Sequence, residues 1–304
     1  MKRKLIVSNI VDKNIYHFFQ AELCELWDIM EEIKKLKSPD TPVLVDVVLS
    51  HFLSEDTAHN WRRDFISGMG FNVLNESAAF DEEIYDEVIS IPKLGWRFDP
   101  TSFSGISEDP SLKRMVATVK ASMGLADEPP SYALLITRKK NRILKDLETG
   151  DFATNIFSEY CDGEKIPFKV ASFENLSLKQ QIKLISKARI LFAVHGAECT
   201  NLIFMAQNAL FVEINFRKHW YCDPVCEDHF SARLDYASKC VGVNNLTRPF
   251  HKADIFMLAQ LFGHDHLEIS FDRADRFLDR NPINVNEITI DFEEIKLLLD
   301  NVKW

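Results

Sequence analysis

The stretch Arg189–Asn215, R-I-L-F-A-V-H-G-A-E-C-T-N-L-I-F-M-A-Q-N-A-L-F-V-E-I-N, decides the fold class of this chain. Two apolar runs, Ile190–Val194 and Ala209–Ile214, lack the apolar/polar alternation of a half-exposed strand and predict buried strands. A turn at His195–Ala197 and a short helix opening near Thr200 separate them. Buried strands joined by helices are typical of a parallel α/β sheet. Ligands bind such sheets at the carboxyl ends of strands, so this turn predicts an anion site at a helix amino terminus.

The composition is that of an ordinary globular protein. With 304 residues, 46% hydrophobic and 27% charged, the chain is long enough for two α/β domains. A net charge of -10 argues against nucleic acid or an anionic membrane as the main partner. No apolar run approaches the ~20 residues of a membrane helix, and the amino-terminal run is too short for a signal peptide. We therefore expect a cytoplasmic protein without a transmembrane segment.

The first half of the chain alternates between strand and helix patterns. Strands are predicted at Lys4–Val11, Val43–Leu49, Phe71–Leu74 and Ile84–Ile91, and helices at Asn14–Leu36, Glu55–Met69 and Leu112–Met123. This order indicates an open, mostly parallel sheet. The double proline in Gly124–Ser131 cannot continue a helix or a central strand, so it predicts an interdomain linker.

After the linker the same alternation begins again. Strands are predicted at Tyr132–Thr137, Pro167–Ala171 and Leu267–Phe271, and helices at Lys145–Cys161, Ser177–Ala188, Glu227–Lys239 and Phe292–Val302. Ser177 and Gln180 suit a capping box. We predict two Rossmann-like domains, 1–125 and 126–265, with parallel sheets facing a central cleft, and a strand and helix at 266–304 near the interface. The cleft is the expected place for chemistry.

Two arginines follow the first strand of the second half. Arg138 and Arg142 lie in T-R-K-K-N-R, at the ligand side of the predicted sheet. Their forked donors match phosphate oxygens, which favours a diphosphate, although a solvated basic turn is the alternative interpretation. Across the sheet, Gly196 lets the backbone approach a ligand, and the amides of the residues that follow it, Cys199, Thr200 and Asn201, would sit at the helix start.

A general base is predicted in the first half. His17 comes just after the first strand, where a neutral imidazole could accept a proton near neutral pH. The other groups placed where a base is needed are Glu22, Asp46 and His51. Single histidines such as His17 and His195 more often serve packing or structural hydrogen bonds.

Metal binding is not expected from the motifs present. The six cysteines are scattered as reduced thiols usually are. Cys222 and Cys226 with His219 and His229 would be an unusual zinc set because a second pair is absent. The chain also has no Asp-x-Asp, the pair that holds a divalent metal against a diphosphate. The pattern favours leaving-group stabilisation by arginine and a helix dipole, and the missing P-loop and G-x-G-x-x-G argue against kinases and dinucleotide enzymes.

The order of the motifs resembles glycosyltransferase family 61. The resemblance rests on N-I-Y-H-F-F-Q-A-E-L-C-E-L-W, I-T-R-K-K-N-R, the run from S-F-E-N-L to H-G-A-E-C-T-N-L-I-F-M, and V-E-I, from about Asn14 to Ile214. It implies a glycosyltransferase-B fold and inverting, metal-independent transfer from a UDP-sugar to a glycan or glycoprotein. No cofactor is implied beyond this substrate.

The resemblance also implies roles for particular residues. The donor diphosphate would be surrounded by Arg138, Arg142, His195, Gly196, Thr200 and Asn201. Ala197 and Glu198 would also belong to the donor-binding site. Glu213 would lie near the nucleoside and His17 would face the acceptor. Two departures stand out: Glu198 replaces a small or apolar residue, and Ala206-Gln207-Asn208 replaces Pro-Pro-Gly. A carboxylate beside phosphate repels it, so Glu198 is expected to turn toward a sugar hydroxyl or a cation.

The sequence therefore predicts an inverting glycosyltransferase, with UDP-xylose as the first donor and UDP-N-acetylglucosamine as the alternative. A catalytically inactive glycan- or nucleotide-binding protein of the same fold is the rival function, because the residues after Ala197 are altered. Eukaryotic relatives work behind a membrane anchor, so a bacterial or viral origin, or a truncated chain, fits this sequence better.

Overall fold

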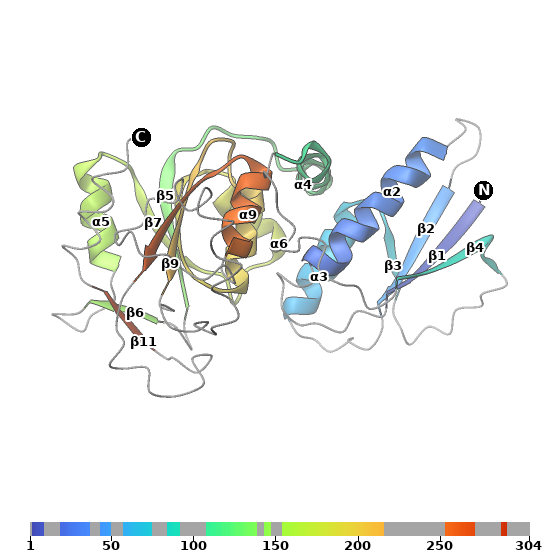
Figure 1. Ribbon diagram of the computed structural model, residues 1–304, viewed down its shortest axis with the longest axis horizontal. Coiled ribbons are helices and arrows are strands. Elements are labelled where there is room, and N and C mark those ends of the chain that lie inside the picture. The colour runs from blue at the N-terminus through green and yellow to red at the C-terminus, as the bar shows by residue number, and fades with distance from the viewer. Residues whose placement is uncertain are drawn as a thin grey trace, which may run out of the picture. The chain divides into compact units, whose positions relative to one another are not determined.

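The computed structural model describes residues 2–8, 19–36, 43–49, 57–74, 84–91, 108–138, 143–146, 154–215, 253–270 and 287–290. These residues fall into two compact units. The first consists mainly of residues 1–99 and 109–126, and the second mainly of residues 127–176 and 181–304. Each unit is built on its own parallel sheet (Figure 1).

The sheet of the first unit has four parallel strands. They are β1 (Lys2–Ser8), β2 (Val43–Leu49), β3 (Asn72–Leu74) and β4 (Glu87–Ile91), in the order β3-β2-β1-β4. The two central strands each contain a buried apolar segment, as is typical of a parallel sheet covered on both faces. Leu5 and Ile6 on β1 are fully buried, as is Val47 on β2. The predicted strand at Val43–Leu49 is confirmed, and the others differ only in their ends.

Helices of the first unit differ more from the sequence prediction. The predicted helix Asn14–Leu36 is described from Phe19, where it opens as a π-helical turn, η1 (Phe19–Leu23), before α2 (Cys24–Leu36). Helix α3 (Thr57–Gly68) and helix α4 (Pro110–Ser122) follow. A π turn admits one extra residue, so a strict 3.6-residue period cannot predict it.

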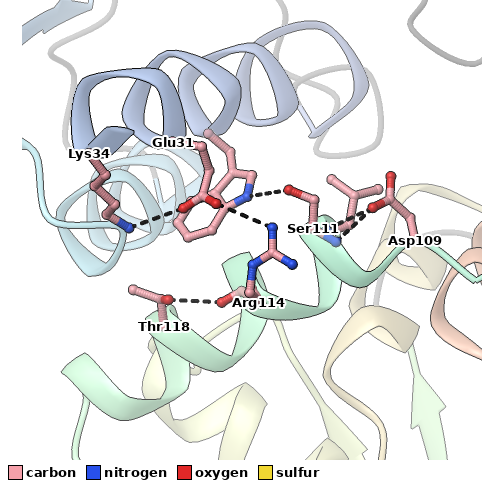
Figure 2. Close-up of polar contacts among 8 residues, drawn as sticks. Glu31, Lys34, Asp109, Ser111, Arg114 and Thr118 are labelled. Carbon is pink, nitrogen blue, oxygen red and sulfur yellow. Dashed lines mark hydrogen bonds and ion pairs between the residues drawn. The ribbon is translucent and has the colours of Figure 1, made fainter. Parts of the chain in front are cut away.

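Polar contacts join α4 to α2 within the first unit (Figure 2). Asp109 caps α4, since its Oδ1 accepts from the amides of Ser111 at 2.8 Å and Leu112 at 3.2 Å. Trp27 of α2 donates its indole N–H to Ser111 Oγ at 3.1 Å. Arg114 Nη2 forms an ion pair with Glu31 Oε2 of α2 at 3.2 Å. The cap therefore orients the turn that meets α2.

The sheet of the second unit has five parallel strands. They are β5 (Tyr132–Thr137), β7 (Phe168–Ser172), β8 (Ala188–Val194), β9 (Leu210–Asn215) and β10 (Asp265–Ser270), in the order β10-β9-β8-β5-β7. A separate pair joins β6 (Ile143–Asp146) to β11 (Glu287–Ile290). The two buried strands predicted in the stretch Arg189–Asn215 are confirmed as β8 and β9, and the structure places them next to each other in this sheet.

The helices of the second unit confirm one sequence signal and correct another. They are α5 (Thr154–Gly163), α6 (Leu178–Ile185), η3 (Ala197–Phe204) and α9 (Ala253–Phe262). The capping box before α6 is confirmed: the Ser177 amide donates to Gln180 Oε1 and the Gln180 amide to Ser177 Oγ. The predicted helix Lys145–Cys161 is wrong at its start, because Ile143–Asp146 pairs with β11. That pairing joins segments too far apart in sequence for a local pattern to reveal.

Helix α9 and strand β11 were not predicted. The predicted helices at Glu227–Lys239 and Phe292–Val302 lie outside the described residues, as do the zinc candidates His219, Cys222, Cys226 and His229.

Candidate functional site

The strand order of the second unit marks one point as the place for a ligand. From β5 the chain moves to one side to form β7, and then returns past β5 to form β8, β9 and β10 in succession. The direction of winding reverses between β5 and β8, and open α/β sheets bind ligands at the carboxyl ends of the strands flanking such a reversal. Arg138 directly follows β5 and His195 directly follows β8. The structure therefore brings these two predicted residues to the reversal point.

Arg138 and Glu198 form an ion pair across this reversal. The Arg138 Nε atom donates to Glu198 Oε2 at 2.9 Å, and the side chains keep 15% and 21% of their exposure. Guanidinium carries five N–H donors, and Nε contributes only one of them. Glu198 thus forms an ion pair with Arg138, the arginine that was expected to bind the diphosphate.

The helix of the site begins earlier than the sequence predicts. Instead of opening near Thr200, η3 is a 3₁₀ helix from Ala197 to Phe204, with Gly196 as its cap. The amides at its amino end are those of Ala197 and Glu198. The Cys199 amide already donates to the Gly196 carbonyl at 3.0 Å. The prediction that the Cys199, Thr200 and Asn201 amides form the helix start is therefore wrong by about one turn.

The side chains of Thr200 and Asn201 point into the protein. They are 0% and 1% exposed, and Thr200 Oγ1 and Asn201 Oδ1 have no hydrogen-bond partner within the described part of the chain. Asn201 Nδ2 donates to the Glu198 carbonyl at 3.2 Å, which helps to hold the first turn of η3. Asn201 therefore supports the turn from within, and the Thr200 side chain is buried beside it in sequence.

Cys199 also lies in this turn. Burial, with the nearby charge of Glu213, raises the pKa of its thiol well above the usual value. A cysteine that stays a thiol is a poor nucleophile.

A buried carboxylate bridges two histidines beside the turn. Glu213 on β9 is 1% exposed; its Oε1 atom contacts His195 Nδ1, and its Oε2 atom lies 2.9 Å from His266 Nε2 on β10. The position of Glu213 near a nucleoside stays a prediction, and in the structure both of its carboxylate oxygens contact imidazole rings. His195 itself retains 16% exposure, so it is the outer member of the group.

The electrostatics of the group are dominated by Glu213. Burial alone raises the pKa of the Glu213 carboxyl, but the charge of His195 and the hydrogen bonds from His195 and His266 outweigh burial and hold this pKa well below its usual range. Glu213 is therefore an anion throughout the neutral pH range.

His266 was missed from the sequence. In the sequence it lies in H-D-H-L-E, two residues before Glu268, so a strand would place both side chains on the same face. The pairing of Glu268 with Glu213 is known only from the structure.

The candidate bases of the first unit that the structure describes are both engaged. Glu22 lies on η1, is 0% exposed and accepts from Arg62 Nη2 at 2.7 Å. Asp46, also fully buried on β2, accepts from Arg3, Asn72 and Tyr85. The structure does not bring either one to an accessible surface. His17, His51 and Arg142 lie outside the described residues.

Two features are absent from the described residues. Within them, His, Cys, Asp and Glu form no group of three or more that could hold a metal ion. No helix in the same part of the chain has the length and apolar character needed to cross a membrane.

No curated protein matches the chain significantly. Among solved structures, a putative spore coat polysaccharide biosynthesis protein E from Chromobacterium violaceum ATCC 12472 aligns over 99% of this chain and 73% of its own, with 11% identity and a TM-score of 0.18. A score this low does not establish a shared fold. The family description Glycosyltransferase 61 matches residues 15–212 of the 304. Since this match covers well over half of the chain, the protein belongs to glycosyltransferase family 61.

Proposed function

We propose that this protein is an inverting glycosyltransferase that moves a sugar from a UDP-sugar to a hydroxyl of a glycan or glycoprotein. Xylose is the first sugar to test as the one transferred. The observation that carries the proposal is the convergence of Arg138 and His195 at the winding reversal of the second sheet. A guanidinium and an imidazole there suit a ligand with two phosphate groups. Family membership supports a glycosyltransferase, and the donor is part of the proposal.

The proposed reaction is a single displacement. The acceptor hydroxyl oxygen attacks the anomeric carbon from the face opposite UDP, the bond from that carbon to the diphosphate oxygen breaks, and a base takes the hydroxyl proton. His17 is the proposed base. Arg138, with Arg142, stabilises the negative charge that grows on the leaving diphosphate, and the amino end of η3 adds its dipole. Because these groups carry the charge, the proposal needs no metal ion.

The proposal includes a glycosyltransferase-B arrangement. The two parallel sheets would then face one cleft, with the donor on the second unit and the acceptor on the first. Small-angle scattering of the protein with and without UDP tests this arrangement, because closure of two domains around a ligand reduces the radius of gyration.

A binding protein without turnover is the second candidate. The observation that favours it is the Arg138–Glu198 pair. In this pair the Glu198 carboxylate accepts from Arg138 Nε, one of the N–H groups expected to donate to the diphosphate. In that case the protein would bind a nucleotide or glycan and leave the donor intact.

A thermal-shift screen followed by a turnover assay separates these candidates. UDP-xylose, UDP-N-acetylglucosamine, UDP-glucose and UDP-arabinose are each added in the presence of a chelator, and the donor is the ligand that raises the melting temperature most. Consumption of that donor that increases with a glycan acceptor supports the enzyme. Binding of UDP without consumption of any donor supports the binding protein, and activity lost in chelator and restored by manganese contradicts metal independence.

Replacement of Arg138 tests the residue at the centre of the proposal. We expect Arg138→Ala to lower turnover ~100-fold or more, the size of effect seen when one donor to a developing anion is removed. The control is Arg189→Ala, which removes an exposed arginine from the beginning of the neighbouring strand β8. Near-normal turnover in Arg138→Ala would exclude Arg138 from the mechanism.

A further inference from the structure

We propose that Glu198 is a positioning residue for Arg138: its carboxylate holds the Nε side of the guanidinium, so that the terminal N–H groups are presented to the diphosphate of the donor. The inference rests on the proposed function, in which Arg138 stabilises the leaving diphosphate. It goes beyond that function because it assigns a role to Glu198. Glu198 then contributes to turnover through Arg138, without a contact of its own to the reacting atoms.

The backbone that carries Glu198 is held on two sides. At the start of the turn, the His195 amide donates to the Ile214 carbonyl of β9 at 2.9 Å. Within the first turn of η3, Asn201 Nδ2 donates to the Glu198 carbonyl at 3.2 Å. Asn201 is 1% exposed, so water competes little for this hydrogen bond. The Glu198 side chain therefore extends from a backbone whose position is well determined.

The Arg138 side chain is longer and has fewer contacts. Arg138 directly follows β5, and its Nε atom donates to Glu198 Oε2 at 2.9 Å. Among the described residues, no second hydrogen bond or ion pair holds this guanidinium. Arginine has high rotamer freedom, and that freedom must be lost before its donors can act together on a ligand. The contact with Glu198 removes part of this freedom before the donor binds.

The atom that Glu198 engages determines which donors remain for a ligand. A guanidinium is planar and has five N–H donors, one on Nε and four on the two terminal nitrogens. Because the group is rigid, a contact at Nε restricts the direction in which both terminal nitrogens point. The edge formed by Nη1 and Nη2 can donate two parallel hydrogen bonds to phosphate oxygens. Glu198 thus takes one donor of Arg138 and orients the pair best suited to a diphosphate.

The same contact places a negative charge near the diphosphate. Like charges repel, so Glu198 weakens donor binding in the ground state, and its pairing with Arg138 offsets only part of that charge. An oriented donor gains strength as charge grows on the leaving oxygen, and such an interaction raises turnover. We therefore expect Glu198 to lower the affinity for the donor and to raise kcat. A residue needed only for stability does not produce this division.

Two substitutions of Glu198 separate the reach of the side chain from its charge. Glu198→Gln keeps the length and an oxygen that can accept from Arg138 Nε, whereas Glu198→Asp keeps the charge and is one methylene shorter. We expect Glu198→Gln to keep kcat within about 3-fold of wild type and Glu198→Asp to lower kcat about 10-fold or more, because misplaced groups catalyse poorly. A larger loss of kcat in Glu198→Gln than in Glu198→Asp would overturn the proposal.

A double-mutant cycle tests whether Glu198 acts through Arg138. Glu198→Ala in the wild-type background should lower kcat about 10-fold or more. In the Arg138→Ala background the same substitution should change kcat by less than about 2-fold, because the side chain to be oriented is gone. Equal losses in both backgrounds would overturn the positioning role.

Glu128→Ala is the matched control for this cycle. Glu128 belongs to the same unit and pairs with Lys187 just before β8, at the amino ends of the strands. The substitution therefore breaks an ion pair away from the site, and kcat should be unchanged. A loss of kcat equal to that of Glu198→Ala would mean that breaking any ion pair of this unit lowers turnover, which would overturn the specific role of Glu198.

A measurement on the free protein does not depend on turnover. The ¹⁵N relaxation of the Arg138 Nε–H group reports its order on the picosecond-to-nanosecond timescale. We expect an ordered Nε–H group in the wild type and in Glu198→Gln, and a mobile one in Glu198→Asp and Glu198→Ala. Thermal unfolding of the same samples shows that each variant is folded. A mobile Nε–H group in the wild type would overturn the proposal.

Failure of the proposed function and failure of the positioning role give different results. If the wild type consumes a UDP-sugar and every substitution of Glu198 leaves kcat unchanged, the proposed function stands and the positioning role fails. If the wild type consumes no UDP-sugar, the proposed function fails and the contribution of Glu198 to turnover fails with it. The relaxation data then still decide whether Glu198 holds Arg138 in place.

Discussion

Both units bury a carboxylate on a central strand, but the two carboxylates have different partners. Asp46 on β2 accepts from Arg3 Nη2 at 3.1 Å, Asn72 Nδ2 at 2.7 Å and the Tyr85 hydroxyl at 2.9 Å. Glu213 on β9 is held by two imidazoles. Burial and the hydrogen bond to Asp46 raise the pKa of Tyr85, so this phenol remains a donor. Every partner of Asp46 keeps its protons near neutral pH.

The partners of Glu213 are both histidines. Histidine is the side chain whose ordinary pKa lies within the physiological range. A buried carboxylate surrounded by permanent donors acts as a fixed structural link between strands, whereas one that faces histidines can control a proton. The partners of a buried carboxylate therefore show its role better than its burial does, since Asp46 and Glu213 are almost equally buried.

Removal of the structural carboxylate should have the largest effect on stability. Asp46→Ala leaves three donors without their shared acceptor, and we expect a loss of about 3 kcal/mol in the free energy of unfolding. Urea denaturation followed by tryptophan fluorescence is a suitable measurement, because Trp27 and Trp61 are buried in the same unit. The folded variant should bind UDP-sugars as the wild type does. A variant of normal stability that fails to bind the donor would reverse the assignment.

The loss of unfolding free energy at acid pH should depend on Glu213. Its folded-state pKa is lowered, so its contribution is fully present above the ordinary glutamate pKa of about 4.3 and is lost as pH falls toward the lower folded value. We expect wild type to lose on the order of 2 kcal/mol through this group as the solution is acidified below about pH 5. Glu213→Gln lacks this component, so the difference between the two curves of unfolding free energy against pH isolates it. Parallel curves would show that Glu213 is not ionised in the folded protein.

The sequence predicted those parts of the fold that local chemistry determines. Val43–Leu49 and Tyr132–Thr137 were predicted with their observed bounds because both are short, apolar and bounded by turn residues. The capping box at Ser177 was predicted because its two hydrogen bonds join neighbours in sequence. Strand β6 was not predicted, since its partner among the described residues, β11, lies more than a hundred residues away.

The site shows the same limit. The position of Arg138 and His195 at strand ends could be predicted, since a strand followed by a turn is a local pattern. The partners could not: Glu198 lies 60 residues from Arg138, and His266 lies 53 residues from Glu213. Whether a carboxylate repels the ligand, orients an arginine or holds a histidine depends on such distant neighbours. The roles of Glu198 and Glu213 therefore required the structure.

Glu198 offers a smaller test of the difference between structural and functional carboxylates. Glu198→Gln removes a negative charge beside the proposed diphosphate site, and its amide oxygen can still accept from Arg138 Nε. We expect UDP-sugar binding to tighten by ~5-fold at low ionic strength and the gain to shrink in salt, because the interaction is between charges near the surface. Calorimetry at two salt concentrations measures both effects. Weaker binding would instead indicate that the Glu198 carboxylate contacts the donor sugar.

The smallest expected effect concerns the cap of α4, where the contacts again are structural. Asp109→Ala removes the acceptor of the Ser111 and Leu112 amides, and loss of an N-cap costs about 1 kcal/mol. The matched control is Thr118→Ala on the same helix, whose hydroxyl donates to the Arg114 carbonyl from an exposed position and should matter less (Figure 2). Denaturant unfolding compares the two variants, and donor binding should be unchanged in both. Altered donor binding in Asp109→Ala alone would mean that α4 helps to shape the site, and the first unit could then no longer be regarded as a purely structural counterpart of the second.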